Sequence, residues 1–279
     1  NNNFIIEPSG RNTAPAIGLA AIHVYHRNEN AVMCIYPADH LIVENEKFCK
    51  IVNEGIHFAQ EHSALITMGI KPTYPATGYG YIQFGNSHAD NSNIYKVKTF
   101  AEKPPLKSAE RFLESGEFLW NSGMFIWKAE IILLEMKTYM PELHESLDVI
   151  YDSFESGKYD IILDREWEII QPESIDYGIM EKAKNGYTLK ADFSWNDMGT
   201  WKSVYDVLSK DKNGMILQGN VLSVESKNSI IYSQDKLTAV IGIDNIAVVN
   251  TDDATLIMPM DYAEKVKEIV NQLSASEMN

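Results

Sequence analysis

The chain has 279 residues, with 24 basic and 39 acidic side chains and a formal net charge of −15. Binding of a nucleic acid requires a basic surface, so this composition argues against DNA or RNA as a partner. No apolar run is long enough to cross a bilayer, so we expect no membrane contact. A small phosphorylated ligand stays compatible with the acidic chain, because one divalent cation and one or two lysines neutralise it locally.

The first residues and the cysteines indicate the compartment. Residues 1–4 carry no basic segment, so we expect no secretory signal. Cys34 and Cys49 are too few for a disulfide framework, and both are expected to be reduced thiols in a cytoplasmic protein.

Residues 31–40, AVMCIYPADH, are the stretch around which the chain is organised. The apolar run before Pro37 predicts a strand buried on both faces, as in a parallel sheet. Asp39 follows directly, and ligands of open α/β sheets lie beyond the carboxyl ends of strands. Asp39 would equally suit the cap of the next helix, so this stretch alone leaves both roles open.

The remaining elements alternate between apolar runs and helical periodicity as far as residue 208. This pattern predicts a large α/β domain that includes a strand–helix–strand unit with a right-handed crossover. We predict helices after residue 13 and over 48–59, 106–114, 131–139, within 142–164, and over 174–183 and 201–208; and strands over 64–70, 94–100, 118–127 and 187–193.

The pattern changes after residue 215, where five short strands follow one another closely between residues 221 and 258. Such spacing predicts a small all-β coil or sheet, followed by a closing helix over residues 262–273. We therefore divide the chain into a first domain of residues 1–215 and a second of residues 216–279.

Four loops carry residues suited to chemistry, and each also has an ordinary structural explanation. The glycines of Thr77–Tyr81 allow a turn or a close approach of backbone to a ligand. Glu102 and Lys103 are either a solvated pair or a site. Asn121–Gly123 interrupts a strand, which marks a bulge or a close approach. Asp197, between two tryptophans, belongs either to an anchored turn or to the same pocket as Asp39.

The ordered set of motifs is far more specific than any member. The chain contains EP…RNTAPA from Glu7, YPADH from Tyr36, TGYGYI from Thr77, EKP from Glu102, WNSGMF from Trp120, SIDYGIME from Ser174 and WNDMGTW from Trp195. In this order they resemble the mannose-1-phosphate guanylyltransferases over nearly the whole chain. The resemblance implies a Rossmann-like nucleotidyltransferase domain followed by a short β-helix, and GDP-mannose synthesis for polysaccharides from GTP and mannose 1-phosphate with Mg²⁺.

The same resemblance implies the roles of single residues. Asp39 and Asp197 would hold the metal, and together with Lys103 they would form the catalytic set. Lys103 would bind the sugar phosphate and Glu102 the sugar hydroxyls. The resemblance further implies that the sugar is contacted by Gly80, Asn121 and Asp176. It implies that the nucleotide is contacted by Glu7, Arg11, Asn12 and Thr13.

One feature of that family is absent. Its members open with a strand and a Gly-rich loop that cradles the triphosphate, whereas this chain starts after that region, and we expect the complete protein to contain it. The absence motivates an alternative, a homologue that binds a sugar nucleotide without turnover. Another alternative is the transferase part of a bifunctional phosphomannose isomerase/guanylyltransferase. The β-rich tail is a candidate surface for a homodimer.

Overall fold

The computed structural model describes residues 3–88 and 91–277. Asn1 and Asn2, which belong to the segment expected to carry no secretory signal, lie outside the described residues. Contacts divide the chain into two compact units. Unit 1 contains Asn1–Ala38 and Ile42–Ser194, and unit 2 contains Asp39–Leu41 and Trp195–Asn279. The domain boundary placed at residue 215 stays a prediction. Each unit is described by itself below.

Unit 1 is built on a six-stranded mixed sheet in the order β1-β6-β3-β7-β5-β4. β3 and β7 run parallel, whereas the other neighbours are antiparallel. Because β6 also pairs with β4, the strands β6, β3, β7, β5 and β4 close into a ring. The strands are β1 (Val32–Ile35), β3 (Leu65–Ile70), β4 (Tyr81–His88), β5 (Asn91–Ala101), β6 (Phe118–Lys128) and β7 (Gly186–Ala191).

Strand β1 departs from its prediction. It pairs antiparallel with β6 and lies at one end of the sheet order. Met33 is buried, but Val32, Cys34 and Ile35 are only partly covered, so the prediction of a strand buried on both faces is wrong. The physical reason is its place, since a strand with one described neighbour is covered on fewer sides than a central one. Cys34 and Cys49 are both free thiols.

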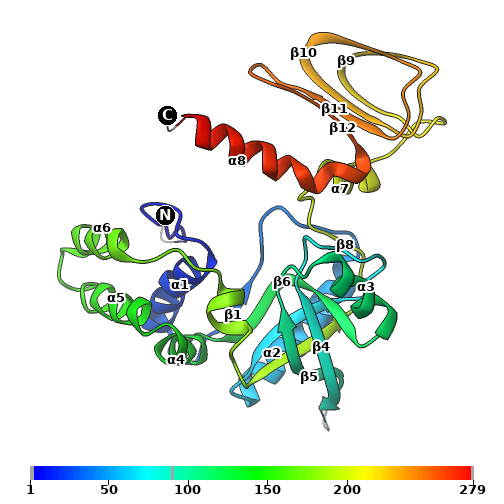
Figure 1. The fold of residues 1–279 in the computed structure, drawn as a ribbon. Helices are drawn as coiled ribbons and strands as arrows, with labels where there is room; N and C mark the ends of the chain where they lie inside the picture. Colours follow the sequence, from blue (N-terminus) through cyan, green and yellow to red (C-terminus); the bar gives the residue numbers. More distant parts are fainter. Residues whose placement is uncertain (1–2, 89–90, 278–279) are drawn as a thin grey trace. The chain divides into compact units, whose positions relative to one another are not determined.

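Two groups of helices cover the two faces of the sheet. Phe125 and Trp127 of β6 point into a core shared with α1, α4, α5 and α6, which lie together in Figure 1. Ile126, between them, points to the opposite face, where it packs against Gly55 of α2. The helices of unit 1 are α1 (Thr13–Arg27), α2 (Asn45–Glu61), α3 (Leu106–Ser115), α4 (Ala129–Tyr139), α5 (Pro141–Asp152) and α6 (Tyr159–Ile169).

The segment predicted as a regular helix over residues 174–183 is instead a short π-helix, η1 (Asp176–Met180). Ile175, Ile179 and Met180 are buried in the core, as their spacing predicted. A π-turn is wider than an α-turn and is found frequently at functional sites. It places Asp176 at the start of the turn.

Unit 2 contains a coil of β9 (Ile216–Val224), β10 (Ile230–Ile241), β11 (Ile246–Asn250) and β12 (Thr255–Pro259) (Figure 1). The first three strands run parallel and β12 is antiparallel to β11. Two of the five predicted strands merge into β10, with an irregularity between Ser233 and Thr238. The core of this coil is a column of buried residues, one from each strand, that are paired across neighbouring strands. They are Ile216, Ile230, Ala247 and Met258.

The other elements of unit 2 pack on this core or lead into it. Trp201 and Val204 of α7 and Val266 of α8 contact the buried column. The predicted closing helix begins as a 3₁₀ turn, η2, before α8. The bounds are α7 (Trp201–Val207), η2 (Met260–Lys265) and α8 (Val266–Glu277), with β2 (Leu41–Ile42) and β8 (Trp195–Asn196) as short strands. None of the helices in the described parts of the chain combines the length and apolarity needed to span a membrane.

Candidate active site

Asn121 lies in the middle of β6, and its buried side chain connects three elements of unit 1. Its Oδ1 accepts a hydrogen bond from Thr67 Oγ1 of β3 over 2.9 Å, and its Nδ2 donates to Asp176 Oδ1 of η1 over 2.8 Å. A shift in register between β3 and β6 occurs here, and Gly123 adopts a φ of 71°. The predicted irregularity in the strand is therefore present and positions an amide toward η1.

Asp176 is a partly buried acid that lies beside a second acid, Glu102. Burial and the charge of Glu102 raise the pKa of Asp176 from 3.8 to about 6, although the hydrogen bond from Asn121 and the charge of Lys103 act in the opposite direction. A carboxylate held in this way keeps both protonation states accessible near neutral pH.

Glu102 and Lys103 follow directly after β5 and form an ion pair of 2.8 Å between Lys103 Nζ and Glu102 Oε1. Burial alone would lower the pKa of Lys103, but the bond to Glu102 and the charges of Asp176 and Tyr177 raise it above its ordinary value. The Glu102 side chain is only 8% exposed, against 55% for Lys103. The pair is therefore not simply a solvated one, because its acid is buried and its base reaches solvent.

The second oxygen of Glu102 is the unusual atom of this site. Glu102 Oε2 is buried and has no hydrogen-bond partner among the described residues. A buried carboxylate oxygen without a donor is costly, so it marks a place where a ligand donor would be stabilising. Lys103 adopts a φ of 44°, and such strain in a non-glycine residue is concentrated at functional sites.

Gly80 lets that oxygen approach the backbone closely. A Cβ atom at this position would collide with Glu102 Oε2 and would lie 3.2 Å from Asn121 Cβ. The carbonyl oxygen of Gly80 accepts the backbone N–H of Asn121 over 2.8 Å. Gly80 is therefore a glycine because the Glu102 side chain approaches its backbone closely, and the predicted approach of a ligand to this backbone stays a prediction. The acid–lysine cluster is defined as Gly80, Glu102, Lys103, Asn121 and Asp176.

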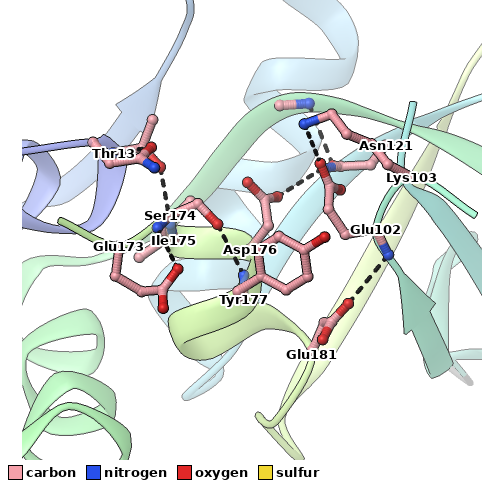
Figure 2. Close-up of polar contacts among 12 residues, drawn as sticks. Thr13, Glu102, Lys103, Asn121, Glu173, Ser174, Ile175, Asp176, Tyr177 and Glu181 are labelled. Carbon is pink, nitrogen blue, oxygen red and sulfur yellow. Dashed lines mark hydrogen bonds and ion pairs between the residues drawn. The ribbon is translucent and has the colours of Figure 1, made fainter. Parts of the chain in front are cut away.

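The loop of residues 7–13 is attached to the same turn (Figure 2). Thr13 Oγ1 accepts a hydrogen bond from the backbone N–H of Ile175 over 2.9 Å, one residue before Asp176. Glu173 N donates to Arg11 O and Ala14 N donates to Glu173 O. The loop that was predicted to contact the nucleotide therefore lies beside the acid–lysine cluster within unit 1.

Within this loop the predicted nucleotide residues divide into two kinds. Asn12 caps α1, because its Oδ1 accepts the N–H of Thr13, and Arg11 Nη2 donates to the carbonyl of Glu168. By contrast, Glu7 Oε2 and Arg11 Nε are buried without a partner among the described residues. These two atoms have unused hydrogen-bonding capacity, whereas the side chains of Asn12 and Thr13 stabilise the loop.

Asp39 and Asp197 both belong to unit 2, together with His40 and Trp195. Trp195 Nε1 donates to His40 Nδ1 over 3.2 Å, with the rings edge to face. Burial lowers the pKa of His40, while the charges of Asp39 and Asp197 act to raise it. Both acids therefore lie within electrostatic reach of one histidine. Asp39 does not cap the next helix, because Glu44 occupies the N-cap position of α2.

Asp197 lies in a tight turn of its own. Its Oδ1 accepts the N–H of Gly199 over 3.2 Å, and Met198 adopts a φ of 52°. Thr200 then caps α7 by accepting the N–H of Ser203. The tryptophan-anchored turn is present, and it orients Asp197.

The fit of these residues to a divalent cation follows from their chemistry. Over residues 3–88 and 91–277, no group of three or more His, Cys, Asp or Glu side chains is placed to hold a metal. Two carboxylates are nevertheless the usual protein contribution to bound Mg²⁺, whose other ligands are water and phosphate oxygens. Asp39 and Asp197 therefore fit a substrate-dependent Mg²⁺ site, and their role as metal ligands stays a prediction.

Sequence reasoning missed several supporting contacts of the acid–lysine cluster. Thr67 orients Asn121, and the backbone N–H of Glu102 donates to Glu181 Oε1 over 3.1 Å (Figure 2). His40 was noted only as a neighbour of Asp39. The one local signal was Thr67, a polar residue within the apolar run of residues 64–70.

Comparison with known proteins identifies the family and the fold of the chain. Residues 1–214 match the model of the nucleotidyl transferase family, and residues 219–273 match that of the MannoseP isomerase/GMP-like beta-helix domain. A mannose-1-phosphate guanylyltransferase from Escherichia coli is 40% identical over 99% of this chain and 60% of its own length. The Xanthan biosynthesis protein XanB of Xanthomonas campestris is 38% identical over 98% of this chain and 57% of its own length.

Solved structures extend the comparison. The structure named mannose-1-phosphate geranyltransferase from Thermus thermophilus has a TM-score of 0.83 and 27% identity, covering 97% of this chain and 77% of its own. A structure named mannose-6-phosphate isomerase from Helicobacter pylori has a TM-score of 0.57 and 25% identity, covering 68% of this chain and 72% of its own. The predicted fold, a mixed α/β domain followed by a β-helix-like domain, is confirmed.

The curated relatives are longer than this chain, which spans about 60% of the first of them. Both family models agree with the order of the two folds along the sequence. Because the first model matches well over half of its residues, the chain belongs to the nucleotidyl transferase family and is a homologue of the mannose-1-phosphate guanylyltransferases.

Proposed function

We propose that the protein containing this chain transfers GMP from GTP to mannose 1-phosphate, with Mg²⁺, and forms GDP-mannose and pyrophosphate. The observation that carries the proposal is the buried oxygen of Glu102 that has no partner among the described residues and lies close to Gly80. An ionised carboxylate accepts strong hydrogen bonds from hydroxyl groups, and a hexose offers several. Lys103, paired to the same carboxylate, is suited to the phosphate of the same sugar.

The residues of the acid–lysine cluster act by positioning. The phosphate of a sugar 1-phosphate is a competent nucleophile at neutral pH, so the site needs no strong base. Lys103 holds that phosphate while Glu102 orients the ring, and this alignment lowers the barrier of an in-line displacement. Asn121 keeps Asp176 at the floor of the cluster through its 2.8 Å hydrogen bond.

The loop of residues 7–13 supplies the nucleotide contacts in this proposal. Arg11 Nε and Glu7 Oε2, both buried and unpartnered, are a donor and an acceptor suited to the edge of a purine base. Bound Mg²⁺, held by Asp39 and Asp197, would offset the negative charge of the phosphates. Preference for guanine and for mannose is part of the proposal, supported by the names of the relatives.

The test is a pyrophosphate-release assay on the complete protein, with each of the four ribonucleoside triphosphates against mannose 1-phosphate and glucose 1-phosphate. We expect turnover with GTP and mannose 1-phosphate that requires Mg²⁺. Glu102→Gln should lower kcat/KM by about tenfold to a hundredfold, since a hydrogen bond to a charged group contributes about 1.5–3 kcal/mol.

Glu110→Gln is the matched control for that substitution, because Glu110 is exposed on α3. It removes the same charge and should leave kcat/KM unchanged. Equal activity of Glu102→Gln and wild type would reject the role of Glu102, and turnover with another triphosphate alone would reject GTP.

A second activity is favoured by one comparison. The chain resembles the Helicobacter pylori structure named mannose-6-phosphate isomerase over about two thirds of its length, and the second family model carries a related description. An isomerase activity of the complete protein is therefore a second candidate, measured by the interconversion of mannose 6-phosphate and fructose 6-phosphate. A homodimer through unit 2 stays a prediction, for which sedimentation of the complete protein is the test.

A further inference from the structure

A pocket of unit 1 lies away from the residues discussed above. It has a volume of about 1110 Å³ and is bordered by α2, the ends of β3 and β7, the β4–β5 hairpin and the segment between α3 and β6. None of the described residues that line it belongs to the acid–lysine cluster or to the loop of residues 7–13. It is therefore a separate cavity that the proposed reaction does not use.

The walls of this pocket are basic although the chain is acidic. Four lysines line it, against the two acids Glu54 and Asp192, in a chain whose net charge is −15. The local balance is thus positive, and a concave surface with charge of one sign concentrates ligands of the opposite sign. The lysines of the pocket are Lys47, Lys50, Lys71 and Lys190.

Lys190 is the most specific feature of the pocket. Its Nζ lies 3.6 Å from the centre of the Phe84 ring and 3.9 Å from that of Tyr95. Two aromatic faces stabilise the ammonium group and fix its position, while they leave its formal charge unneutralised. No carboxylate forms an ion pair with Lys190 among the described residues.

Neither acid of the pocket forms an ion pair with Lys190 in the described part of the chain, and each takes part in another contact. Glu54 Oε2 accepts a hydrogen bond from Asn93 Nδ2 over 3.3 Å. Asp192 contributes its backbone carbonyl, which accepts from Lys47 Nζ over 3.3 Å. A cation that is held in position without a carboxylate counter-ion is suited to bind an anionic ligand.

The rest of the lining is apolar. Leu119 is buried at the floor, and Leu113 and Phe118 are partly covered beside it. Ligand sites commonly combine such apolar walls with a few fixed polar groups. The combination suits a molecule with both a phosphate group and an aromatic or apolar body.

We propose that this pocket binds a phosphorylated small molecule whose phosphate pairs with Lys190 and neighbouring lysines and whose apolar body lies against Leu113, Phe118 and Leu119. Phosphate carries nearly two charges at neutral pH and forms charge-assisted hydrogen bonds with lysine. The attraction is partly solvent-exposed, so binding weakens as salt increases.

Phenyl phosphate, which joins an aromatic ring to a phosphate, is the simplest probe. Titration calorimetry of the complete protein should detect its binding in the low-millimolar range or tighter. Lys190→Met should weaken binding at least about tenfold, while Lys190→Arg should retain most of it because Arg keeps the charge. Thermal unfolding of both variants checks that the fold is intact.

Two lysine controls separate this pocket from the proposed active site. Lys103→Met changes the acid–lysine cluster and Lys107→Met changes an exposed lysine of α3, and both should bind the probe as wild type does. Loss of binding in Lys103→Met with full binding in Lys190→Met would overturn the proposal, as would the absence of binding to wild type. The experiment requires no turnover, so its outcome is independent of the proposed transferase activity.

Discussion

Asn121 Nδ2 and Asp176 Oδ1 are joined by a 2.8 Å hydrogen bond that connects strand β6 to the π-helix η1. The bond crosses 55 positions of sequence and lies next to the ion pair of Glu102 and Lys103. It holds the partly buried Asp176 beside a second acid, Glu102. Such an arrangement lowers the free energy of unfolding and is found at sites that bind ligands.

The pKa of Asp176 leads to the first prediction. In the folded chain this pKa is about 6, above the ordinary value of 3.8, so the folded state binds the proton more tightly than the unfolded state. The contribution of Asp176 to the free energy of unfolding is therefore largest at low pH, and it is lost as the pH rises from about 4 to about 6. Asp176→Asn should stabilise the chain relative to wild type at about pH 8, by roughly 2 kcal/mol more than at about pH 4.5, because the unfolded carboxyl is already mostly ionised at the lower pH.

Urea unfolding of wild type and Asp176→Asn at both pH values measures this difference. Asp164→Asn, at an exposed position of α6, removes the same charge without the burial and should show no such dependence. The same change in unfolding free energy at both pH values would contradict the buried, proton-binding state of Asp176.

The second prediction concerns Gly80. A methyl group there collides with Glu102 Oε2, so Gly80→Ala displaces the carboxylate that we propose to bind the sugar. KM for mannose 1-phosphate should increase about tenfold, which corresponds to about 1.4 kcal/mol.

Gly186→Ala is the control for Gly80→Ala. Gly186 is also buried, but its added methyl group would lie 3.5 Å from Val97 Cβ, an ordinary contact. Steady-state kinetics should show an unchanged KM for this variant. An unchanged KM in Gly80→Ala would exclude a sugar site in front of Glu102.

The third prediction addresses the metal. Asp39→Asn and Asp197→Asn each remove one of the two proposed carboxylate ligands. Each substitution should weaken divalent-cation binding at least about tenfold. It should lower kcat by a larger factor, because a metal ion stabilises the transition state by on the order of several kcal/mol. Binding of Mn²⁺ in the presence of GTP, followed by electron paramagnetic resonance, measures affinity without turnover.

Asp206→Asn is the control for these two variants. Asp206 lies on α7 of the same unit and forms an exposed ion pair with Lys202 of 3.6 Å. Its loss should leave Mn²⁺ affinity unchanged. Full Mn²⁺ affinity in both Asp39→Asn and Asp197→Asn would remove them from the metal site.

Local patterns in the sequence predicted most elements of the fold. Helix α3 and its end at Gly116 follow from helical spacing and a left-handed glycine, whose φ is 68°. The core residues of η1 were also predicted, but its π geometry was not, because periodicity specifies which face is buried and not the width of the turn. The burial of β1 was overestimated, since an apolar run does not reveal how many neighbours a strand has.

The candidate site was only partly predictable. The resemblance carried by the ordered motifs pointed to Glu102, Lys103 and Asn121, whereas their positions after or within strands left an ordinary structural explanation open. No local pattern indicates that Thr67 orients Asn121, or that Lys190 lies between Phe84 and Tyr95. Such contacts join strands that are distant in sequence, so they appear only when the sheet is formed.

The fourth prediction tests the coil of unit 2. Gly219 of β9 adopts a φ of 88°, and a Cβ there would run into the carbonyl oxygen of Ser233 on β10. Both the left-handed conformation and the close backbone approach require glycine, so Gly219→Ala should force β9 and β10 apart. We expect the free energy of unfolding to decrease by at least about 2–3 kcal/mol, in the range of strained backbone and overpacking.

Gly242→Ala separates the two causes. Gly242 has a φ of 65°, but an added Cβ would meet nothing within 4 Å. Its substitution therefore costs only the left-handed strain of about 1–2 kcal/mol. Thermal unfolding followed by circular dichroism should show Gly219→Ala to be the less stable variant, because only there does the new methyl group displace backbone. If the two variants unfold at the same temperature, the close approach of β9 to β10 contributes nothing beyond backbone strain.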